Sequence, residues 1–136
     1  MNYHDEKMKK KLIGEIVRKD YLRLHSIICE VLGECSINVR SKGYSYIQDA
    51  IYLIFALERM DLCLNRDIYP HIADKYGISG ISGIEHAIRN AIKSAYNTYT
   101  VYSPPGTEFM STFSGRPSNK EFLLNLMLEV DRRMAG

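Results

Sequence analysis

The stretch that decides the fold is "YGISGISGIEHAIRNAIKSAY", residues 76–96. Its first half is rich in glycine and serine, which is typical of a turn. Apolar residues then recur at steps of three and four, as they do on one face of an α-helix. These residues are Ile84, Ala87, Ile88, Ala91, Ile92, Ala95 and Tyr96. Ser82 and Glu85 have the spacing of a capping box, so we expect the helix to begin at Ser82.

A shorter helix is expected immediately before this turn, in "NRDIYPHIADKYG", residues 65–77. Its apolar face consists of Ile68, Ile72, Ala73 and Tyr76. Pro70 lacks an amide donor and therefore belongs in the first turn or marks a bend. Gly77 is placed to end the helix.

Two helices joined in this way form a helix-turn-helix when three local requirements are met. The crossing needs a small residue, the turn needs a residue that tolerates a left-handed backbone, and the second helix needs a branched apolar anchor. Ala73, Gly77 and Ile84 meet these requirements in that order. We therefore predict that the third and fourth helices of the chain form a helix-turn-helix.

Another amphipathic helix is predicted from Lys11 to Leu32, broken near Asp20 and ended by Gly33. Its apolar residues are Leu12, Ile13, Ile16, Val17, Leu24, Ile27, Ile28 and Val31. Lysines precede it, namely Lys7, Lys9, Lys10 and Lys11. They could contact phosphate, but a solvated helix end is the favoured interpretation.

The next helix is predicted to open with a capping box of Ser45 and Gln48. Its residues Ile47, Ala50, Ile51, Ile54 and Glu58 follow at helical spacing. Most of its surface is apolar, so we expect it to be the central helix of the domain.

The C-terminal part of the chain is predicted to hold one short helix and one long helix. Prolines and glycines restrict residues 98–117 to a short helix near Thr107 to Phe113, and only residues 98–102 show a strand-like alternation. Ser118 and Glu121 form a further capping box. The last helix is then marked by Phe122, Leu123, Leu126, Met127 and Val130 and ends in Arg132 and Arg133. The fold class is all-α, a compact bundle of about six helices.

The bulk composition is that of one globular domain. The chain has 136 residues, 46% hydrophobic residues and a net charge of +2, so any affinity for nucleic acid must come from a local patch. No apolar run reaches the length of a membrane span, and the N-terminus lacks the features of a secretory signal. We expect a cytoplasmic protein with no membrane partner.

Cysteine and histidine usage predicts neither a metal nor a cofactor. Cys29, Cys35 and Cys63 are odd in number and form no CxxC pair, so we expect reduced core thiols. The histidines, His4, His25, His71 and His86, have no metal-ligand spacing. We interpret His71 as an exposed residue of the third helix. No Ser/His/Asp or Cys/His arrangement, carboxylate pair or phosphate loop stands out, so an enzyme is not expected.

The candidate functional residues lie opposite the aliphatic stripe of the helix that begins at Ser82. They are Ser82, Gly83, Glu85, His86, Arg89, Asn90 and Lys93. Arginine can pair with guanine, asparagine with adenine, and glutamate can accept from the amino group of cytosine. The free amides at the helix start can bind a phosphate. This pattern favours binding of duplex DNA, and a merely solvated outer face is the alternative.

Two other groups of residues are candidates for contact with nucleic acid. Tyr96, Tyr99 and Tyr102 could stack on bases, but packing against other helices is favoured because an apolar segment lies beside them. His86 lies on the side that would face the groove and would add positive charge near phosphates below about pH 6.5.

Four blocks of the sequence resemble a known family in the family's own order. They are "KGYSYIQDAI" (42–51), "IYPHIADKYG" (68–77), "IEHAIRNAI" (84–92) and "GRPSNKEFL" (115–123). The chain resembles, over about residues 21–133, the C-terminal DNA-binding effector domain of the master sporulation response regulator, stage-zero sporulation protein A of endospore-forming bacteria. The resemblance implies a six-helix domain whose third and fourth helices form the helix-turn-helix. It also implies a bacterial transcription factor that binds promoter DNA as a tandem dimer.

The sequence departs from the family pattern at two points. The family's recognition helix typically reads S-R-V-E-R-A-I-R-H-A-I, whereas Gly83 and His86 stand here in place of two arginines, and the turn is one residue longer. Glu85 and Arg89 are retained, so we expect weakened or retuned DNA binding. About 20 residues precede the matching region, which is too short for the family's receiver domain.

We therefore expect residues 1–20 to be an N-terminal helical and basic extension and residues 21–136 to be the DNA-binding domain. The leading functional hypothesis is a sequence-specific transcriptional regulator that reads the major groove of promoter DNA, with a homodimer as the expected assembly. The alternative is an interaction module that forms a heterodimer with a full-length response regulator and modulates it without strong DNA binding.

Overall fold

The computed structural model describes the backbone of residues 3–136 and the side chains of residues 5–8 and 18–136. All regular structure in this described part of the chain is helical, which confirms the all-α prediction. The elements are α1 (Tyr3–Glu34), α2 (Lys42–Leu57), the π-helical turn η1 (Leu64–Ile68), α3 (Tyr69–Tyr76), α4 (Ser82–Tyr102), α5 (Glu108–Ser111) and α6 (Asn119–Ala135). Over the residues that the structure describes, no helix combines the length and apolar character that a bilayer span requires.

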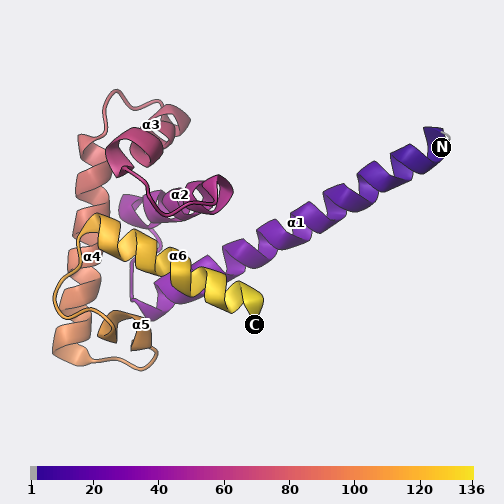
Figure 1. Ribbon diagram of the computed structural model, residues 1–136. Coiled ribbons are helices and arrows are strands. Elements are labelled where there is room, and N and C mark those ends of the chain that lie inside the picture. Colours follow the sequence, from indigo (N-terminus) through magenta and orange to yellow (C-terminus); the bar gives the residue numbers. More distant parts are fainter. Residues whose placement is uncertain (1–2) are drawn as a thin grey trace.

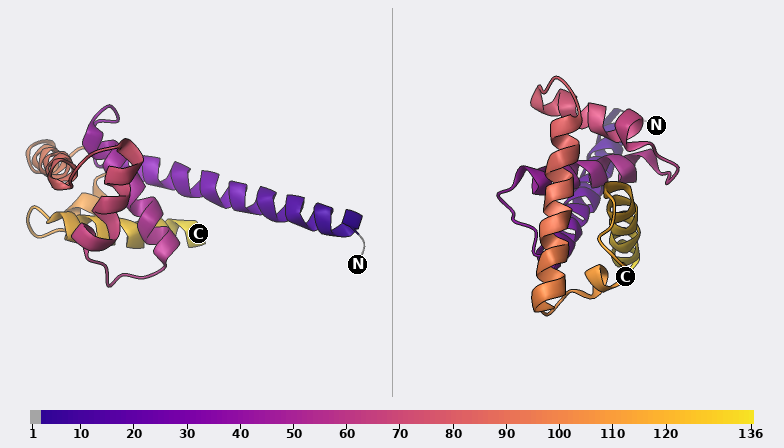
Figure 2. Two further views of the ribbon diagram at one scale, coloured as in Figure 1. Left: turned by 90° about the horizontal axis from the view of Figure 1, so that it is seen from above. Right: turned by 90° about the vertical axis from the view of Figure 1, so that its left-hand side faces the viewer.

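Helix α2 lies at the centre of the domain, as predicted. It contacts α1, η1, α3, α4 and α6. Helix α4 lies along one side of the molecule, with α3 beside its start and α5 beside its end, whereas the N-terminal part of α1 extends away from the other helices (Figure 1). Viewed from the side of α4, that helix stands in front of the others along its length (Figure 2).

The core is built by the apolar faces that the periodicity predicted. Its fully buried aliphatic residues include Ile28, Ile47, Ile51, Ile72, Ile84, Ile88 and Leu126. Each fully buried side chain of this size contributes about 1.5–3 kcal/mol relative to an exposed one. Every long helix therefore contributes one stripe to a single core.

Helix α1 differs from its prediction at both ends. It begins at Tyr3, continues through Asp20 without a break, and ends at Glu34 rather than at Gly33. The left-handed residue after it is Ser36, with φ of 60°. Of the predicted stripe, Leu24, Ile28 and Val31 are buried, while the side chains of Leu12, Ile13, Ile16 and Val17 lie outside the described residues, as do those of Lys9, Lys10 and Lys11. The predicted boundary between residues 20 and 21 falls inside this helix and stays a prediction.

The start of α2 corrects the predicted capping box. The N-cap is Ser41, whose side chain accepts a hydrogen bond from the amide of Tyr44 at 3.1 Å. Ser45 lies one turn inside the helix, and Gln48 donates instead to the thiol of Cys29 at 3.2 Å. Ser41 and Ser45 are both suitable N-cap residues by local sequence. With Ser41 as the N-cap, Tyr44 and Tyr46 lie within the helix and are buried.

Helix α3 ends as predicted but begins differently. Gly77 has φ of 65° and closes the helix, and Pro70 lies in its first turn. The residues before it form the π-helical turn η1, in which the Tyr69 amide bonds the Leu64 carbonyl. Pro70 has no amide to donate to the Arg66 carbonyl, so a regular α-helix cannot run through this point. The predicted exposure of His71 is confirmed.

Helix α4 begins at Ser82, as predicted, but without a capping box. Its N-cap is Ile81, and no side chain of the cap accepts a hydrogen bond. The Glu85 side chain pairs with Arg89 instead of returning to the helix start. The helix continues to Tyr102, so the alternation at residues 98–102 did not indicate a strand.

The C-terminal helices follow their predictions. Helix α5 occupies four residues of the predicted short segment. Ser118 and Glu121 form a complete capping box at the start of α6. Phe122, Leu123, Leu126, Met127 and Val130 are buried.

Candidate nucleic-acid interface

Helix α4 has a buried aliphatic face and an exposed polar face. Ile84, Ile88, Ile92 and Ala95 are at most 1% exposed and hold the helix in the core. On the opposite side, His86, Arg89, Asn90 and Lys93 are exposed. Ser82 and Gly83 are exposed at the helix start, and Glu85 is half-buried. The aliphatic stripe thus fixes the helix so that its polar side faces solvent.

The position of α4 depends on a close approach to the first turn of α2. A Cβ atom added to Gly43 would lie 2.4 Å from the Ala87 carbonyl oxygen and 2.7 Å from the Ala91 Cβ. Only glycine leaves room for this approach, and the small residues Ala87 and Ala91 complete it. The crossing lies beneath the part of α4 that carries the candidate residues.

The connection from α3 to α4 is built on the residues that the sequence singled out. Ala73 is buried, and its carbonyl accepts the amide of Ile78 at 2.9 Å across the left-handed Gly77. Gly80 has φ of 142°, a conformation that side chains rarely adopt. Ile84 is completely buried at the start of the next helix. The turn therefore has the left-handed residue, the small contact residue and the branched anchor that were predicted.

Three of the predicted site residues form one connected group. Arg89 pairs with Glu85 one turn earlier, and its Nη1 lies 3.5 Å from His86 Nδ1. The Arg89 side chain is 47% exposed, so this pairing is solvated and is worth less than about 1 kcal/mol. The guanidinium can therefore exchange Glu85 for another acceptor at little cost.

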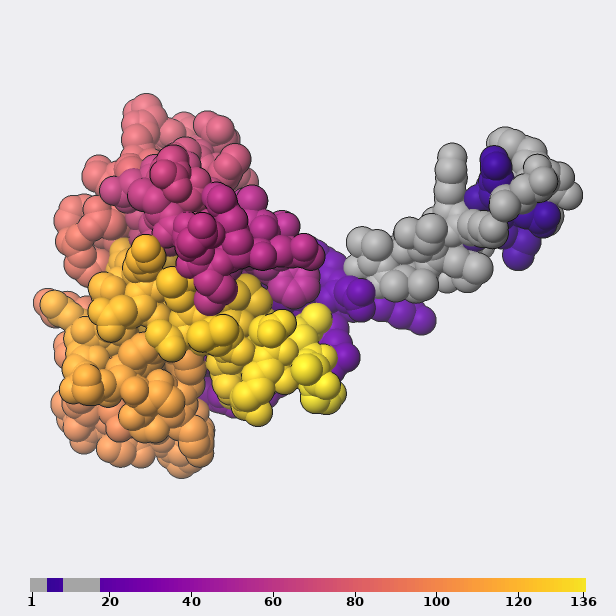
Figure 3. Space-filling view, in the orientation of Figure 1, coloured from indigo at the N-terminus to yellow at the C-terminus, as the bar shows by residue number. Residues whose placement is uncertain are grey.

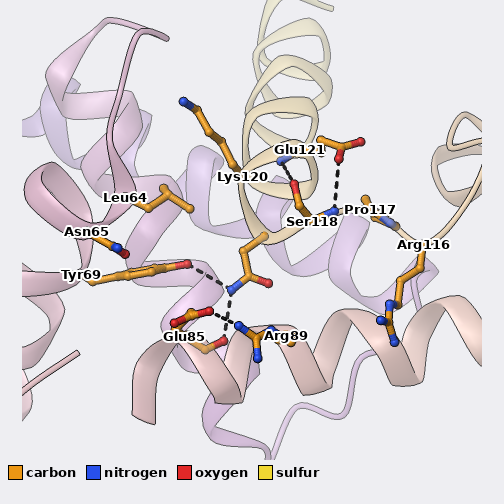
Figure 4. A pocket seen from close by; sticks show the side chains of 11 residues that line it. Leu64, Asn65, Tyr69, Glu85, Arg89, Arg116, Pro117, Ser118, Lys120 and Glu121 are labelled. Carbon is orange, nitrogen blue, oxygen red and sulfur yellow. Dashed lines mark hydrogen bonds and ion pairs between the residues drawn. The ribbon is translucent and has the colours of Figure 1, made fainter. Parts of the chain in front are cut away.

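A hollow of about 480 Å³ separates this part of α4 from the start of α6 (Figure 4). Arg89 and Glu85 line it from α4, Arg116 lines it from the segment that leads into α6, and Lys120 lines it from the first turn of α6. Arg116 and Lys120 are both exposed. Three cationic side chains thus border one concave surface beside the exposed face of α4.

Asn119 joins the helices around this hollow. Its Nδ2 donates to the Tyr69 hydroxyl and to the Glu85 carbonyl oxygen, at 3.1 Å each. Burial raises the pKa of Tyr69, so its hydroxyl stays protonated and available as a hydrogen-bonding group. Asn119 of α6 therefore connects α3 and α4 through one side chain.

Arg116, Asn119 and Lys120 were not among the predicted site residues. Arg116 and Lys120 lie 27 and 31 positions after Arg89, too far apart for any periodic pattern to connect them. The one available signal was their place in the block "GRPSNKEFL", which carries the family resemblance.

A second polar cluster fixes α3 on α2. The carboxylate of Asp49 is buried, and it accepts from Lys75 Nζ at 2.6 Å and from the Tyr76 hydroxyl at 2.7 Å. The hydrogen bond to Asp49 raises the pKa of Lys75, and burial followed by Asp49 raises that of Tyr76. Both donors therefore remain protonated at neutral pH. This cluster sets the angle at which α3 reaches the turn.

The structure corrects two predictions about the remaining tyrosine and cysteine residues. Tyr96 and Tyr99 pack partly against the core, as favoured, but Tyr102 is 76% exposed. Cys35 is buried and Cys29 half-buried, but Cys63 is exposed rather than a core thiol. Among the side chains described, no group of three or more His, Cys, Asp or Glu residues could hold a metal ion.

Comparison with known protein families identifies the family to which this domain belongs. Residues 28–130 match the family described as the sporulation initiation factor Spo0A C terminal. This family consists of DNA-binding regulators of transcription in sporulation. Since the matched region covers most of the 136 residues, the chain belongs to the family of the Spo0A C-terminal domain. The resemblance noted from the four blocks is therefore confirmed.

Proposed function

We propose that α3 and α4 form a helix-turn-helix and that α4 reads bases in the major groove of promoter DNA. The observation that carries this proposal is the division of α4 into a completely buried aliphatic face and an exposed polar face. A helix held in this way can enter a groove about 12 Å wide without loss of core contacts. The family's DNA-binding function supports the same conclusion. The protein then acts in the cytoplasm, where promoter DNA is accessible.

The exposed side chains of α4 have distinct roles in this proposal. Arg89 pairs with a guanine edge and Asn90 with an adenine edge, while Glu85 and His86 contact neighbouring bases. Lys93, one turn further along, binds a phosphate. The amides at Ser82 and Gly83 bind a second phosphate at the positive end of the helix.

The hollow beside α4 extends the proposed contact surface to the phosphate backbone. Arg116 and Lys120 are exposed cations on its far wall. A DNA strand that follows the groove past Arg89 would approach both of them. Each phosphate neutralised by such a side chain adds about 0.9 to the salt dependence of binding.

A binding titration with matched arginine variants tests the proposal. Duplexes selected from a random library are titrated by fluorescence anisotropy at two salt concentrations. Arg89→Ala should weaken binding by about 1–3 kcal/mol and relax one base position. Arg132→Ala removes the same charge from an exposed site at the other end of α6 and serves as the control. Equal losses for the two variants, or no binding at low salt, would reject base readout by α4.

An interaction module is the second candidate function, and one surface favours it. A hollow of about 460 Å³ lies between the end of α2 and the last half of α6. Phe55, Met60 and Leu128 line it and are 38%, 37% and 55% exposed. Figure 3 shows these regions of the chain, magenta and yellow, bordering one another on one face. Exposed apolar side chains bordered by the charged residues Glu58, Arg59 and Asp131 fit a protein partner, either a second copy or a full-length regulator.

Co-purification in the absence of DNA distinguishes this second candidate. A full-length regulator should be retained by the wild-type chain and lost with Leu128→Asp. Retention that is unchanged by Leu128→Asp, or no retention at all, would remove the support for this interface.

A further inference from the structure

A chain of polar side chains connects α1 and α2 far along the sequence from the α4 surface. His25 and Cys29 are one turn apart on α1, and Gln48 and Tyr52 are one turn apart on α2. Cys29 Sγ lies 3.6 Å from His25 Nε2, and the other ring nitrogen, Nδ1, contacts the Tyr52 hydroxyl. This Cys/His arrangement was not predicted, although the spacing of four residues between His25 and Cys29 on a helix is the signal that could have shown it.

Tyr52, His25 and Cys29 are arranged as the orienting group, the base and the nucleophile of an activated thiol would be. A nucleophile needs a base within reach and a third group that orients the base. His25 is exposed to solvent, and its ring is stacked on Tyr52 at 6.2 Å between centroids. Burial and the neighbouring Tyr21 raise the pKa of Tyr52, so its hydroxyl stays neutral. Tyr52 therefore orients the imidazole without competing for the proton.

The sulfur also has a donor that favours negative charge. Gln48 Nε2 donates to Cys29 Sγ at 3.2 Å, from a helix other than that of the base. A donor to sulfur stabilises the thiolate as it forms. Cys29 is half-buried, so the sulfur retains access to a small reagent.

The other two cysteines provide internal comparisons. Cys35 is 2% exposed, and burial together with Glu34 raises its pKa to about 12. A buried thiol of this kind is unreactive. Cys63 is exposed, and its backbone amide donates to Asp67 at 2.9 Å. The arrangement of base, orienting hydroxyl and amide donor around Cys29 is thus a specific feature of the α1–α2 contact.

We propose that Cys29 is a modification site that forms a mixed disulfide with a small-molecule disulfide, with His25 as the general base. Nδ1–H of His25 donates to the Tyr52 hydroxyl oxygen, and Nε2 takes the proton from Sγ. A bond forms between Sγ and one sulfur of the reagent while the reagent's own S–S bond breaks. The departing thiolate takes the proton from Nε2. Cys29 is oxidised and one half of the reagent is reduced to a thiol, so no other oxidant is needed.

The adduct has a structural consequence at the α1–α2 contact. The new S–S bond replaces the Gln48 hydrogen bond and places added atoms beside Tyr44, whose pKa is raised to about 12 by burial and by Cys29. Since α2 packs on α4, a shift of α2 at this contact can change the position of α4 and of its exposed face.

The test follows reaction of the folded chain with 2,2′-dithiodipyridine at about pH 7. Cys63→Ser is the parent, so that only Cys29 and Cys35 remain, and peptide mass analysis assigns the adduct. We expect one modification per molecule, at Cys29. His25→Gln keeps a donor for Tyr52 but removes the base, and should slow the reaction at least about threefold. Tyr52→Phe should slow it as well, because the ring loses its orienting contact.

A second measurement separates base catalysis from altered folding. The same variants are treated in denaturant, where His25 no longer faces Cys29 and all rates should become equal. Modification confined to Cys35 would overturn the proposal. So would a His25→Gln rate in the folded state within about threefold of the parent rate.

Discussion

The substitution Gly43→Ala tests how α4 is held. The added Cβ would lie 2.4 Å from the Ala87 carbonyl oxygen and 2.7 Å from the Ala91 Cβ. Carbon atoms pack at about 3.5–4.0 Å, so the two helices would have to separate by about 1 Å. Overpacking of this kind costs about 1–3 kcal/mol. Alanine gains at most about 1 kcal/mol of helix propensity over glycine, and less in a first turn. We expect a net loss of about 1–2 kcal/mol in the free energy of unfolding.

Urea unfolding followed by far-ultraviolet circular dichroism measures this loss. Gly33→Ala is the matched control, since Gly33 lies in α1 with nothing within 4 Å of an added Cβ. It should leave stability unchanged or raise it by up to about 1 kcal/mol. Opposite signs for the same chemical change would identify the α2–α4 crossing as the cause. A Gly43→Ala protein as stable as wild type would refute the packing argument.

Two further changes probe the polar contacts. Tyr76→Phe removes the 2.7 Å hydrogen bond to buried Asp49 and should lower the free energy of unfolding by about 1 kcal/mol, because water can partly replace the lost donor; Tyr102→Phe, at an exposed site, should change nothing, and equal effects in the urea titration would contradict this interpretation. Asp67 has its pKa lowered from 3.8 to about 2 by Arg66 and the Cys63 amide, so its ionised form stabilises the fold above about pH 4 and that contribution is lost as the pH falls toward 2. The difference in Tm between wild type and Asp67→Asn should therefore shrink between about pH 4 and pH 2, and a difference that stays constant would count against the assigned pKa.

The sequence predicted the faces of the helices better than their starts. Burial of Ile47, Ile84 and Leu126 follows from periodicity, because one apolar stripe per helix is enough to define a core. The first residue of a helix depends on which of several nearby polar residues serves as its N-cap. Ser41 and Ser45 are locally equivalent, and only the packing of the whole domain selects Ser41.

Contacts between distant segments account for what the sequence could not show. The Asn119 bridge joins residues 34 and 50 positions away, and the Gly43 approach joins α2 to α4. Neither leaves a local pattern. The outer face of α4 was recognisable from the spacing of Arg89 and Asn90, but the cations at Arg116 and Lys120 became part of the same surface only through the fold.

The length of α4 gives the Gly43 crossing a mechanical meaning. The helix has 21 residues, and Ala87 and Ala91 lie nearer its start than its end. At 1.5 Å per residue, the arms on either side of this fulcrum measure about 10 Å toward Ser82 and about 20 Å toward Tyr102. If α4 rotated as a rigid helix about this contact, a displacement at Tyr102 would produce a displacement of about half that size, in the opposite direction, at Ser82. Under the proposed function, a displacement of the exposed end at Tyr102 would therefore be accompanied by a smaller, opposite displacement of the end that we propose to face DNA.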